Sequence, residues 1–265
     1  MKDRRPKVVM LCSFATSSFY IFNAIKKDVD IELVIYERPS GLINKARKKF
    51  KIIKNRSKRL GFNTVFGQLL FKVFETFYLN KKSKKRSNDV IAQYDLDDAV
   101  PEIENYRVIS SVKDEKIINY VAEVGPDVVL VNGTGILSAS IIDGIKCPII
   151  NTHVGITPKY RGSHGGYWAL ANDDIENFGV TVHLIDPGID TGGVLYQERT
   201  RITKEDTFKT YPLHQIGIAM PLIVKSLYDA ASDNLVVKEK EKESFLWSHP
   251  TLFQYIRNWK EKGVK

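Results

Sequence analysis

Cysteine is scarce in this sequence: Cys12 and Cys147 are the two among 265 residues, and they form no Cys-x-x-Cys pair. Two isolated thiols provide no disulfide framework, and each lies in an apolar run of the kind found in β-strands. We therefore expect both to be small core residues and not nucleophiles. The scarcity of cysteine and the absence of a signal peptide before the first apolar run predict a reducing, cytoplasmic setting.

Long hydrophobic runs are also missing. The first apolar run, residues 8–12, is too short to span a bilayer, and the apolar segment 65–79 is interrupted by Lys72 and Glu75. We therefore expect no integral membrane segment. Hydrophobic residues make up 43% of the chain and aromatic residues 11%, which is enough for a sizeable core and argues against a disordered chain.

Strand-like and helix-like segments alternate along most of the chain. We expect strands at residues 7–12, 31–37, 107–110, 127–132 and 148–153, and helices at 19–27, 113–124, 138–144, 165–172 and 208–231. Residues 178–186 and 194–202 should form an antiparallel pair of strands. This alternation predicts an α/β fold, with a Rossmann-like, mostly parallel twisted sheet and flanking helices.

Three segments fall outside this alternation. Residues 45–79 are typical of two helical pieces, the second of them apolar along one face at 65–79. The polar residues 81–98 predict a loop or linker. The tail 245–259 carries five aromatic residues and is expected to dock on the rest of the chain. We therefore expect a catalytic domain at 1–231, with a basic helical insertion at about 41–98, and a short C-terminal extension at 232–265.

The most informative stretch lies between residues 151 and 197. Asn151 and His153 stand two apart, so on an extended strand their side chains point to the same face. An amide and an imidazole side by side can hold one oxygen atom, and a later carboxylate can orient the imidazole or take a proton. This equipment suits acyl transfer through an oxyanion, which needs no Ser or Cys nucleophile.

Four elements in this stretch resemble the signature of the folate-dependent formyltransferases, and among these the chain is most similar to the sugar N-formyltransferases. The elements are Asn151-Thr152-His153, the Pro-x-Tyr-x-Gly run 158–162, the Gly-Val-Thr-x-His strand 179–183, and Asp190, seven residues past His183. The resemblance implies transfer of a formyl group from 10-formyltetrahydrofolate, used as co-substrate without a metal, to a primary amine.

The resemblance also implies roles for individual residues. Asn151 would donate a hydrogen bond to the oxyanion through its side-chain amide, and His153 would add a second donor. Asp190 would hold His153 in orientation, raise its pKa and accept the proton lost by the attacking amine. His183 is assigned to the strand framework.

The same resemblance divides the cleft into a folate side and an acceptor side. The folate side is expected on two loops, which contribute Gly135, Ile136 and Leu137 after the fourth strand and Asp186 and Ile189 opposite them. Four residues are assigned to the acceptor side, namely Ser13, Tyr160, Arg161 and Tyr167.

Members of the family differ in their acceptor. Glycinamide ribonucleotide enzymes carry a Gly-rich phosphate loop after the first strand, whereas residues 13–18 here hold no glycine. Methionyl-tRNA formyltransferases carry a C-terminal barrel, for which the 34 residues after Ala231 are too few. We therefore expect a nucleotide-linked amino-sugar used for surface polysaccharide. Glycinamide ribonucleotide and a hydroxylated amino acid are the alternatives. The sequence names neither the sugar, its amine position nor the nucleotide, and a homodimer stays open.

The net charge of +9 is unevenly distributed. Residues 45–86 hold 15 Lys or Arg against one acid, Glu75, a local balance of +14 that leaves −5 for the rest. The plain interpretation is a solvated face; the sharper ones are a site for a nucleotide diphosphate or an anionic membrane surface. A different class of function, a catalytically dead scaffold that binds nucleic acid or membrane, is supported by this basic segment alone. Intact Asn151, His153 and Asp190 argue against that class, so we expect no nucleic acid partner.

Overall fold

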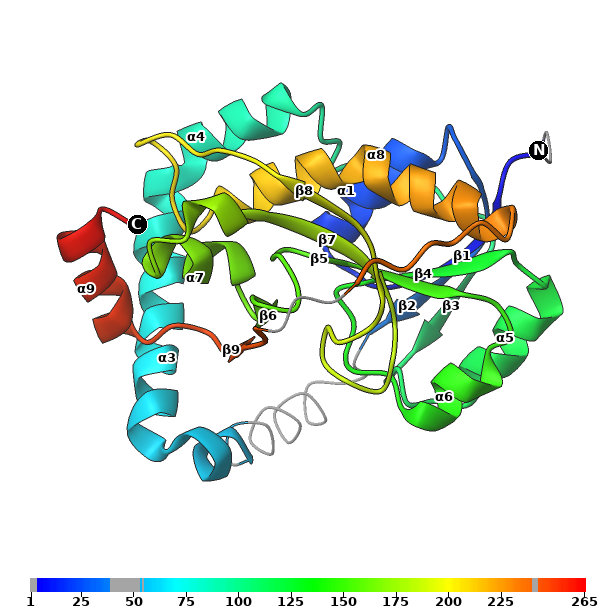
Figure 1. The fold of residues 1–265 in the computed structure, drawn as a ribbon, viewed down its shortest axis with the longest axis horizontal. Helices are drawn as coiled ribbons and strands as arrows, with labels where there is room; N and C mark the ends of the chain where they lie inside the picture. Colours follow the sequence, from blue (N-terminus) through cyan, green and yellow to red (C-terminus); the bar gives the residue numbers. More distant parts are fainter. Residues whose placement is uncertain (1–3, 39–52, 54, 240–242) are drawn as a thin grey trace.

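A seven-stranded sheet runs through the centre of the computed structural model, which describes residues 4–38, 53, 55–239 and 243–265 (Figure 1). Its strand order is β3-β2-β1-β4-β5-β7-β8. Neighbouring strands are parallel from β3 to β5, and β7 and β8 are added antiparallel, which confirms the predicted α/β fold with a Rossmann-like, mostly parallel sheet. The strands are β1 (Lys7–Ser13), β2 (Asp30–Glu37), β3 (Tyr106–Ile109), β4 (Val128–Asn132), β5 (Ile149–His153), β7 (Gly179–Leu184) and β8 (Val194–Arg199).

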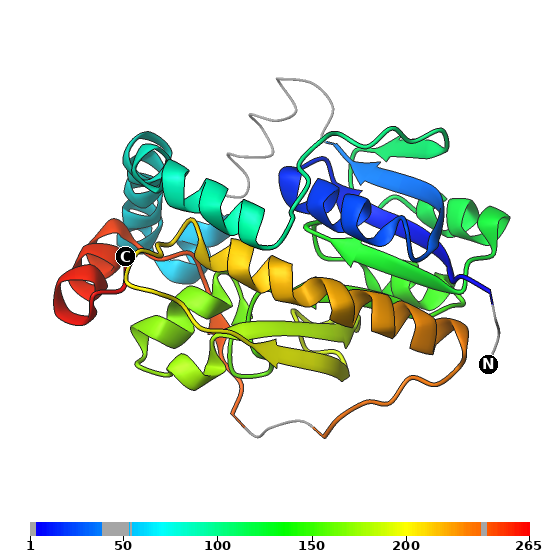
Figure 2. The ribbon, with the colours of Figure 1, turned by 90° about the horizontal axis from the view of Figure 1, so that it is seen from above.

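Helices cover both faces of this sheet (Figures 1 and 2). Alternate residues of β1 point to opposite faces. Val8, Met10 and Cys12 pack against α1 (Thr16–Ile25) and α8 (Tyr211–Ala231). Val9 and Leu11 pack against α5 (Lys116–Val124) and α6 (Ala139–Gly144). Burial on both faces explains why residues 8–12 are continuously apolar. It also raises the pKa of the Cys12 thiol to about 12, so Cys12 is a core residue, as expected.

A helical arm extends beside the sheet (Figure 1). It consists of α3 (Phe62–Phe74), the π-helical turn η1 (Glu75–Leu79) and α4 (Asn80–Gln93). Helix α3 and the turn confirm the apolar helical piece expected at 65–79. Residues 55–60 are helical as well, whereas the rest of the first basic piece, residues 45–52 and 54, lies outside the described residues.

The loop expected at residues 81–98 is wrong over most of its length, because α4 occupies it. Its Lys and Arg residues have good helix propensity, and a narrow face is buried: Ser83 and Val90, two turns apart, are almost fully covered. Arg86 forms an ion pair with Asp206 at 2.8 Å. The exposed lysines between these positions give the sequence the composition of a linker.

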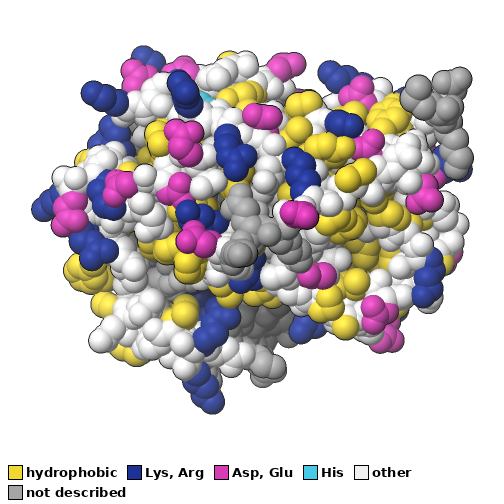
Figure 3. Space-filling model, in the orientation of Figure 1, with side chains coloured by type: hydrophobic (Ala, Val, Ile, Leu, Met, Phe, Trp, Pro, Cys, Tyr) yellow, Lys and Arg dark blue, Asp and Glu magenta, His cyan; other side chains and the backbone are white. Residues whose placement is uncertain are grey.

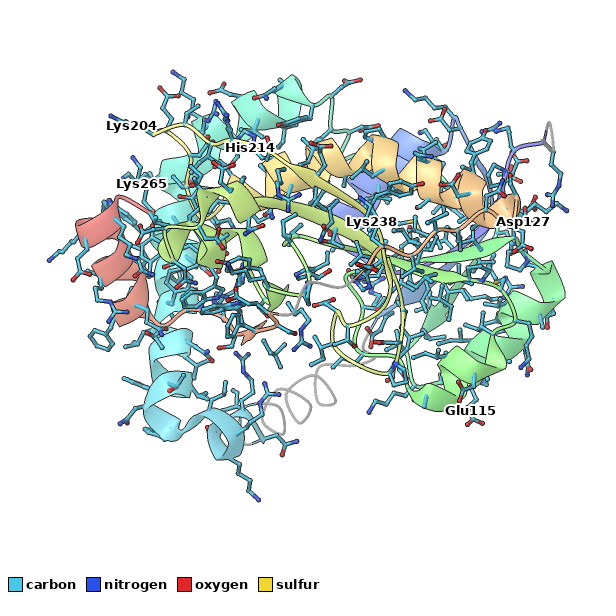
Figure 4. All side chains as sticks on the ribbon, in the orientation of Figure 1. Glu115, Asp127, Lys204, His214, Lys238 and Lys265 are labelled. Carbon is cyan, nitrogen blue, oxygen red and sulfur yellow. The ribbon has the colours of Figure 1, made fainter. Side chains whose placement is uncertain are left out.

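Asp206 joins this arm to the start of α8. Its Oδ1 also accepts a hydrogen bond from His214 Nε2 at 2.9 Å; Figure 4 labels His214 near the N-terminal end of α8. Burial alone raises the pKa of Asp206, but Arg86, the backbone of Thr203 and His214 together hold it well below its usual range. The carboxylate is therefore a charged anchor between two elements far apart in sequence.

The C-terminal segment docks on the arm, as expected of its aromatic residues. Strand β9 (Leu246–Trp247) pairs with β6 (Arg161–Gly162), and α9 (Leu252–Lys262) packs on α3. Tyr255 is buried in a cluster of aromatic rings that joins α9 and α3 to α7 (Gly165–Ala171), which the short turn η2 (Ile175–Asn177) follows. Whether residues 232–265 are an extension separate from the catalytic domain stays a prediction.

The strand order fixes where a ligand can bind. From β1 the chain moves outward to β2 and β3, and it then returns to the other side of β1 as β4. The loops after β1 and β4 therefore diverge. Sheets of this kind bind ligands outside the carboxyl ends of their strands at such a point.

Candidate active site

A cavity of about 980 Å³ opens at this edge of the sheet. One wall is formed by the carboxyl ends of β4 and β5 together with His183 of β7. The loops 133–137 and 185–190 form one end. The other end, which we call the distal end, is formed by five residues from the helical stretch 55–60 before the arm, the start of α7 and the C-terminal segment: Arg56, Arg59, His164, Trp247 and His249.

Asn151 and His153 both reach this cavity from β5, as their spacing predicts. The antiparallel register places His183 opposite Asn151. Asn151 Nδ2 lies 3.1 Å from His183 Nε2, and His183 Nδ1 lies 2.7 Å from the Leu184 carbonyl oxygen. Because a carbonyl oxygen only accepts, His183 Nδ1 carries the hydrogen and Nε2 accepts from the amide. Within the described residues no hydrogen bond takes the second N–H of Asn151, which is left for a ligand.

His153 lies between a backbone carbonyl and a carboxylate. Its Nε2 donates to the Tyr160 carbonyl oxygen at 2.7 Å, and its Nδ1 lies 3.4 Å from Asp190 Oδ2. In the neutral ring Nδ1 therefore carries a lone pair, and a proton that arrives there converts the contact with Asp190 into an ion pair. Since both ring nitrogens face other acceptors, this arrangement supports proton transfer better than the expected role of second oxyanion donor.

Burial and Asp190 act in opposite directions on the pKa of His153. Removal from water lowers this pKa by more than the carboxylate raises it: Asp190 acts in the expected direction, and the pKa of His153 is nevertheless lowered overall. For Asp190 burial raises the pKa, but its neighbours outweigh burial and hold the pKa at about 2; the N–H of Gly162, which donates to the carboxylate, is one of them. At neutral pH the resting site therefore holds a neutral His153 beside a charged Asp190.

Strand β6 holds Asp190 in place. The N–H of Gly162 donates to Asp190 Oδ2 at 2.8 Å. Gly162 has a φ of +90°, and a Cβ there would lie 2.3 Å from the Trp247 carbonyl oxygen, so the position requires glycine. Because Trp247 belongs to β9, the C-terminal segment reaches the Asp190 carboxylate through β6.

The match to known families agrees with this geometry. Residues 78–214, just over half of the chain, match the family described as Formyl transferase. The chain belongs to the formyl transferase family. The matched region includes Asn151, His153 and Asp190, and it confirms the resemblance inferred from the four sequence elements.

Curated relatives of this formyl transferase family member include the methionyl-tRNA formyltransferase of Clostridium beijerinckii, 29% identical over 167 residues, which covers 62% of this chain and 52% of the relative. The chain spans about half the length of the curated relatives it matches.

Solved structures of the family share the fold. Glycinamide ribonucleotide transformylase 1 from Symbiobacterium toebii aligns with a TM-score of 0.57 and 13% identity over 93% of this chain and 96% of that one. A sugar N-formyltransferase from a Shewanella species aligns with a TM-score of 0.52 and 19% identity over 90% of this chain and 75% of that one. At such identities the likeness shows the fold alone.

The residues assigned to the folate side all line the cavity. Two of them also form hydrogen bonds within the protein. The N–H of Gly135 donates to the Glu37 carboxylate at 2.8 Å, and Asp186 Oδ1 accepts from the Gly188 N–H at 3.0 Å. These contacts fix the loop shapes, and contact with folate stays a prediction. The five residues are Gly135, Ile136, Leu137, Asp186 and Ile189.

Tyr160 and Tyr167, both assigned to the acceptor side, are core residues with 2% of their surface exposed. The Tyr160 hydroxyl donates to Asp174 at 2.7 Å, and the Tyr167 hydroxyl accepts from Asn258 at 2.9 Å. Each buried ring thus has a partner for its polar group inside the fold. Because neither ring lines the cavity, we correct their assignment and do not place them at the acceptor.

Ser13 and Arg161, the other acceptor-side residues, lie just behind the cavity wall. Ser13 ends β1 beneath the loop after β4, where a Cβ on Gly133 would lie 2.8 Å from its hydroxyl oxygen. Arg161 donates to the Ile189 carbonyl at 2.9 Å and so helps to hold the loop that carries Asp190. The structure therefore gives both residues supporting positions, and direct contact with an acceptor stays a prediction.

Two features of the site escaped the sequence interpretation. His183 was assigned to the framework, although it holds the amide of Asn151; its place opposite Asn151 depends on strand register, which the motif does not reveal. The rings of His164 and His249 lie against each other at the distal end, with centroids 4.5 Å apart and planes tilted by 57°. Burial, and next the neighbouring His249, lowers the pKa of His164 to about 3. No sequence signal joins these two histidines.

Proposed function

We propose that this chain transfers a formyl group from 10-formyltetrahydrofolate to the primary amine of a nucleotide-linked amino-sugar. One observation carries the proposal: the Asn151 amide N–H that His183 does not bind lies on the same cavity wall as His153 and Asp190. An oxyanion donor and a proton acceptor at one place are what formyl transfer to an amine requires.

The proposed reaction uses these residues in sequence. The amine nitrogen forms a bond to the formyl carbon, and the formyl oxygen takes up negative charge beside the Asn151 amide. The proton lost by the amine passes to Nδ1 of His153, where the Asp190 carboxylate stabilises the resulting imidazolium. When the intermediate collapses, the bond from carbon to the folate nitrogen breaks and that nitrogen takes the proton from His153. The residues end as they began.

The distal end supports a nucleotide-linked acceptor. Arg56 and Arg59 supply positive charge for a diphosphate, and Trp247 lines the same space. Arg56 is held by Gln68, whose side-chain nitrogen in turn donates to the His249 carbonyl at 2.6 Å. Such a cavity is large enough for a folate head and a second ligand of moderate size.

The loop after β1 argues against glycinamide ribonucleotide as acceptor. The hydroxyl of Ser18 contacts the Asn132 amide at 3.0 Å, and that of Ser17 contacts it at 3.4 Å. Residues 13–18 contain no glycine that would let backbone N–H groups surround a phosphate closely. A terminal phosphate monoester would therefore be bound poorly here.

Methionyl-tRNA is the second candidate acceptor. The curated relatives named above act, by their names, on methionyl-tRNA. The basic arm would also suit a nucleic acid backbone. The two candidates differ in the size of the acceptor and in the need for the distal end, so they can be separated by binding.

Titration with uridine, thymidine and guanosine diphosphates tests the nucleotide part of the proposal. We expect at least one of them to bind, and the double variant Arg56→Ala with Arg59→Ala to weaken it by at least about tenfold while sparing folate. The control is Lys84→Ala with Lys85→Ala, which removes the same charge from exposed positions of α4 that do not line the cavity. Binding of none of the three nucleotides, together with formylation of methionyl-tRNA or glycinamide ribonucleotide, would contradict the proposal.

A further inference from the structure

An exposed apolar stripe runs along the arm. Phe62, Phe66, Leu69 and Val73 follow one another at steps of three and four residues, which places them on one face of α3, and Phe77 continues the series in the π-helical turn. These five side chains are between 44% and 78% exposed, although each is large and apolar. The opposite face of α3 carries the buried residues Val65, Gly67, Gln68 and Phe71. The helix therefore has a second apolar face that the described part of the chain leaves exposed.

The surface around the apolar stripe is positively charged. Between residues 55 and 86 seven Lys or Arg side chains are exposed, and no acid is. The one acid of this range, Glu75, is buried and forms ion pairs with Lys72 and Lys209, both at 2.7 Å. Its charge is therefore already compensated and faces inward. Figure 3 shows hydrophobic and basic side chains together at the lower left of the molecule, where α3 lies in Figure 1.

The charge of this surface selects among possible occupants. A second copy would bring the same surface against itself, because two-fold contacts are self-complementary, and fourteen exposed cations would then face one another. A nucleic acid would neutralise the cations and its bases can stack on the phenylalanines, but it would leave Leu69 and Val73 without an apolar partner. An anionic lipid surface supplies both negative headgroups and an apolar layer for the phenylalanines.

We propose that the apolar stripe and the cations beside it bind this protein to the surface of an anionic lipid membrane. Within the described residues no helix is both long and apolar enough to cross a bilayer, so the contact would be interfacial, with α3 lying along the headgroup layer. The inference does not rest on the proposed acceptor: none of the five stripe residues lines the active-site cavity, and of the seven exposed cations Arg59 alone does.

Sedimentation with lipid vesicles tests this inference. We expect the protein to pellet with vesicles of phosphatidylglycerol and phosphatidylcholine in equal parts, and not with phosphatidylcholine alone, at low salt. Added salt should release it. The double variant Phe66→Ser with Val73→Ser should lower the vesicle partition coefficient by at least about tenfold. Both side chains are at least half exposed, so the variant should fold normally.

Two controls make the experiment decisive. Val100→Ser with Val236→Ser removes two exposed apolar side chains from elsewhere in the chain and should leave vesicle binding unchanged. Formyl transfer in solution should be the same in all of these proteins. The inference is overturned if the wild-type protein stays in the supernatant at low salt, or pellets equally with both kinds of vesicle. It is also overturned if light scattering shows that the wild-type protein is a dimer and the Phe66→Ser, Val73→Ser variant a monomer. Binding of RNA without binding of vesicles would overturn it as well.

Discussion

The amide of Asn151 has two N–H groups with different tasks: one is held by His183 and the other faces the cavity. Asn151→Ala and the nearly isosteric Asn151→Asp both remove the donor that would stabilise an oxyanion. We expect kcat to fall by at least about a hundredfold in each, because one such donor is worth roughly 2.7–4 kcal/mol of barrier. Tetrahydrofolate release measures kcat, and a direct titration should show nearly unchanged folate binding. If either variant retains more than about a tenth of wild-type turnover, Asn151 does not have this role.

We expect two neighbouring histidines, His164 and His249, to make the stability of the fold depend on pH. Burial lowers the pKa of His164 to about 3 and that of His249 to about 4, from an ordinary value of 6.5. Below pH 6.5 the unfolded chain therefore binds protons that the folded chain does not, and stability falls with pH down to about 4 for His249 and about 3 for His164. For His164 the loss between about pH 7.5 and pH 5 is roughly 2 kcal/mol.

His164→Asn tests this origin of acid sensitivity, since asparagine does not titrate there and tolerates the φ of 60° at this position. Urea unfolding at the two pH values should show a pH-dependent loss smaller by about 2 kcal/mol in the variant. An unchanged difference between the two pH values would show that His164 already carries its proton in the folded state.

At the scale of elements, the pairing of β6 with β9 links the C-terminal segment to Asp190. Gly162→Ala would place a Cβ 2.3 Å from the Trp247 carbonyl oxygen and displace the N–H that Asp190 accepts. We expect kcat to fall by roughly tenfold to a hundredfold, the value of a hydrogen bond to a charged group, with folate binding little changed. The matched control is Gly61→Ala, where φ is +84° but nothing lies within 4 Å of the added Cβ. Equal turnover of the two variants would show that the Gly162 N–H in β6 does not support the catalytic role of Asp190.

The sequence predicted well those helices and strands whose hydrophobic pattern can be seen within the element itself. Strand β1 is apolar throughout because both faces are covered, and the i, i+3, i+4 spacing of α3 is visible in the chain. Helix α4 was missed because its burial is limited to a few positions, of which Ser83 and Arg86 are polar and find partners near Asp206, over a hundred residues away. A polar composition then resembles that of a linker.

At the scale of the whole molecule, the motif residues were brought together as their spacing predicts, and the rest of the site was not foreseeable. Asn151, His153 and Asp190 lie within one short stretch, so the motif alone relates them. The partner of Asn151, His183, depends on the antiparallel register of β7 on β5. The distal end joins residues 55–60, the start of α7 and the C-terminal segment, and contacts between segments so far apart cannot be predicted from local sequence.

The central claim is that this fold formylates the amine of a nucleotide-linked amino-sugar, and one measurement tests it most directly. The protein is incubated with 10-formyltetrahydrofolate and a panel of nucleotide-linked amino-sugars, with glycinamide ribonucleotide and methionyl-tRNA in parallel, and each acceptor is examined by mass spectrometry for one added formyl group. We predict formylation of at least one amino-sugar nucleotide by the wild-type protein, with at least about a hundredfold less by Asn151→Ala. Formylation of methionyl-tRNA or glycinamide ribonucleotide with every amino-sugar nucleotide left unchanged would contradict the account.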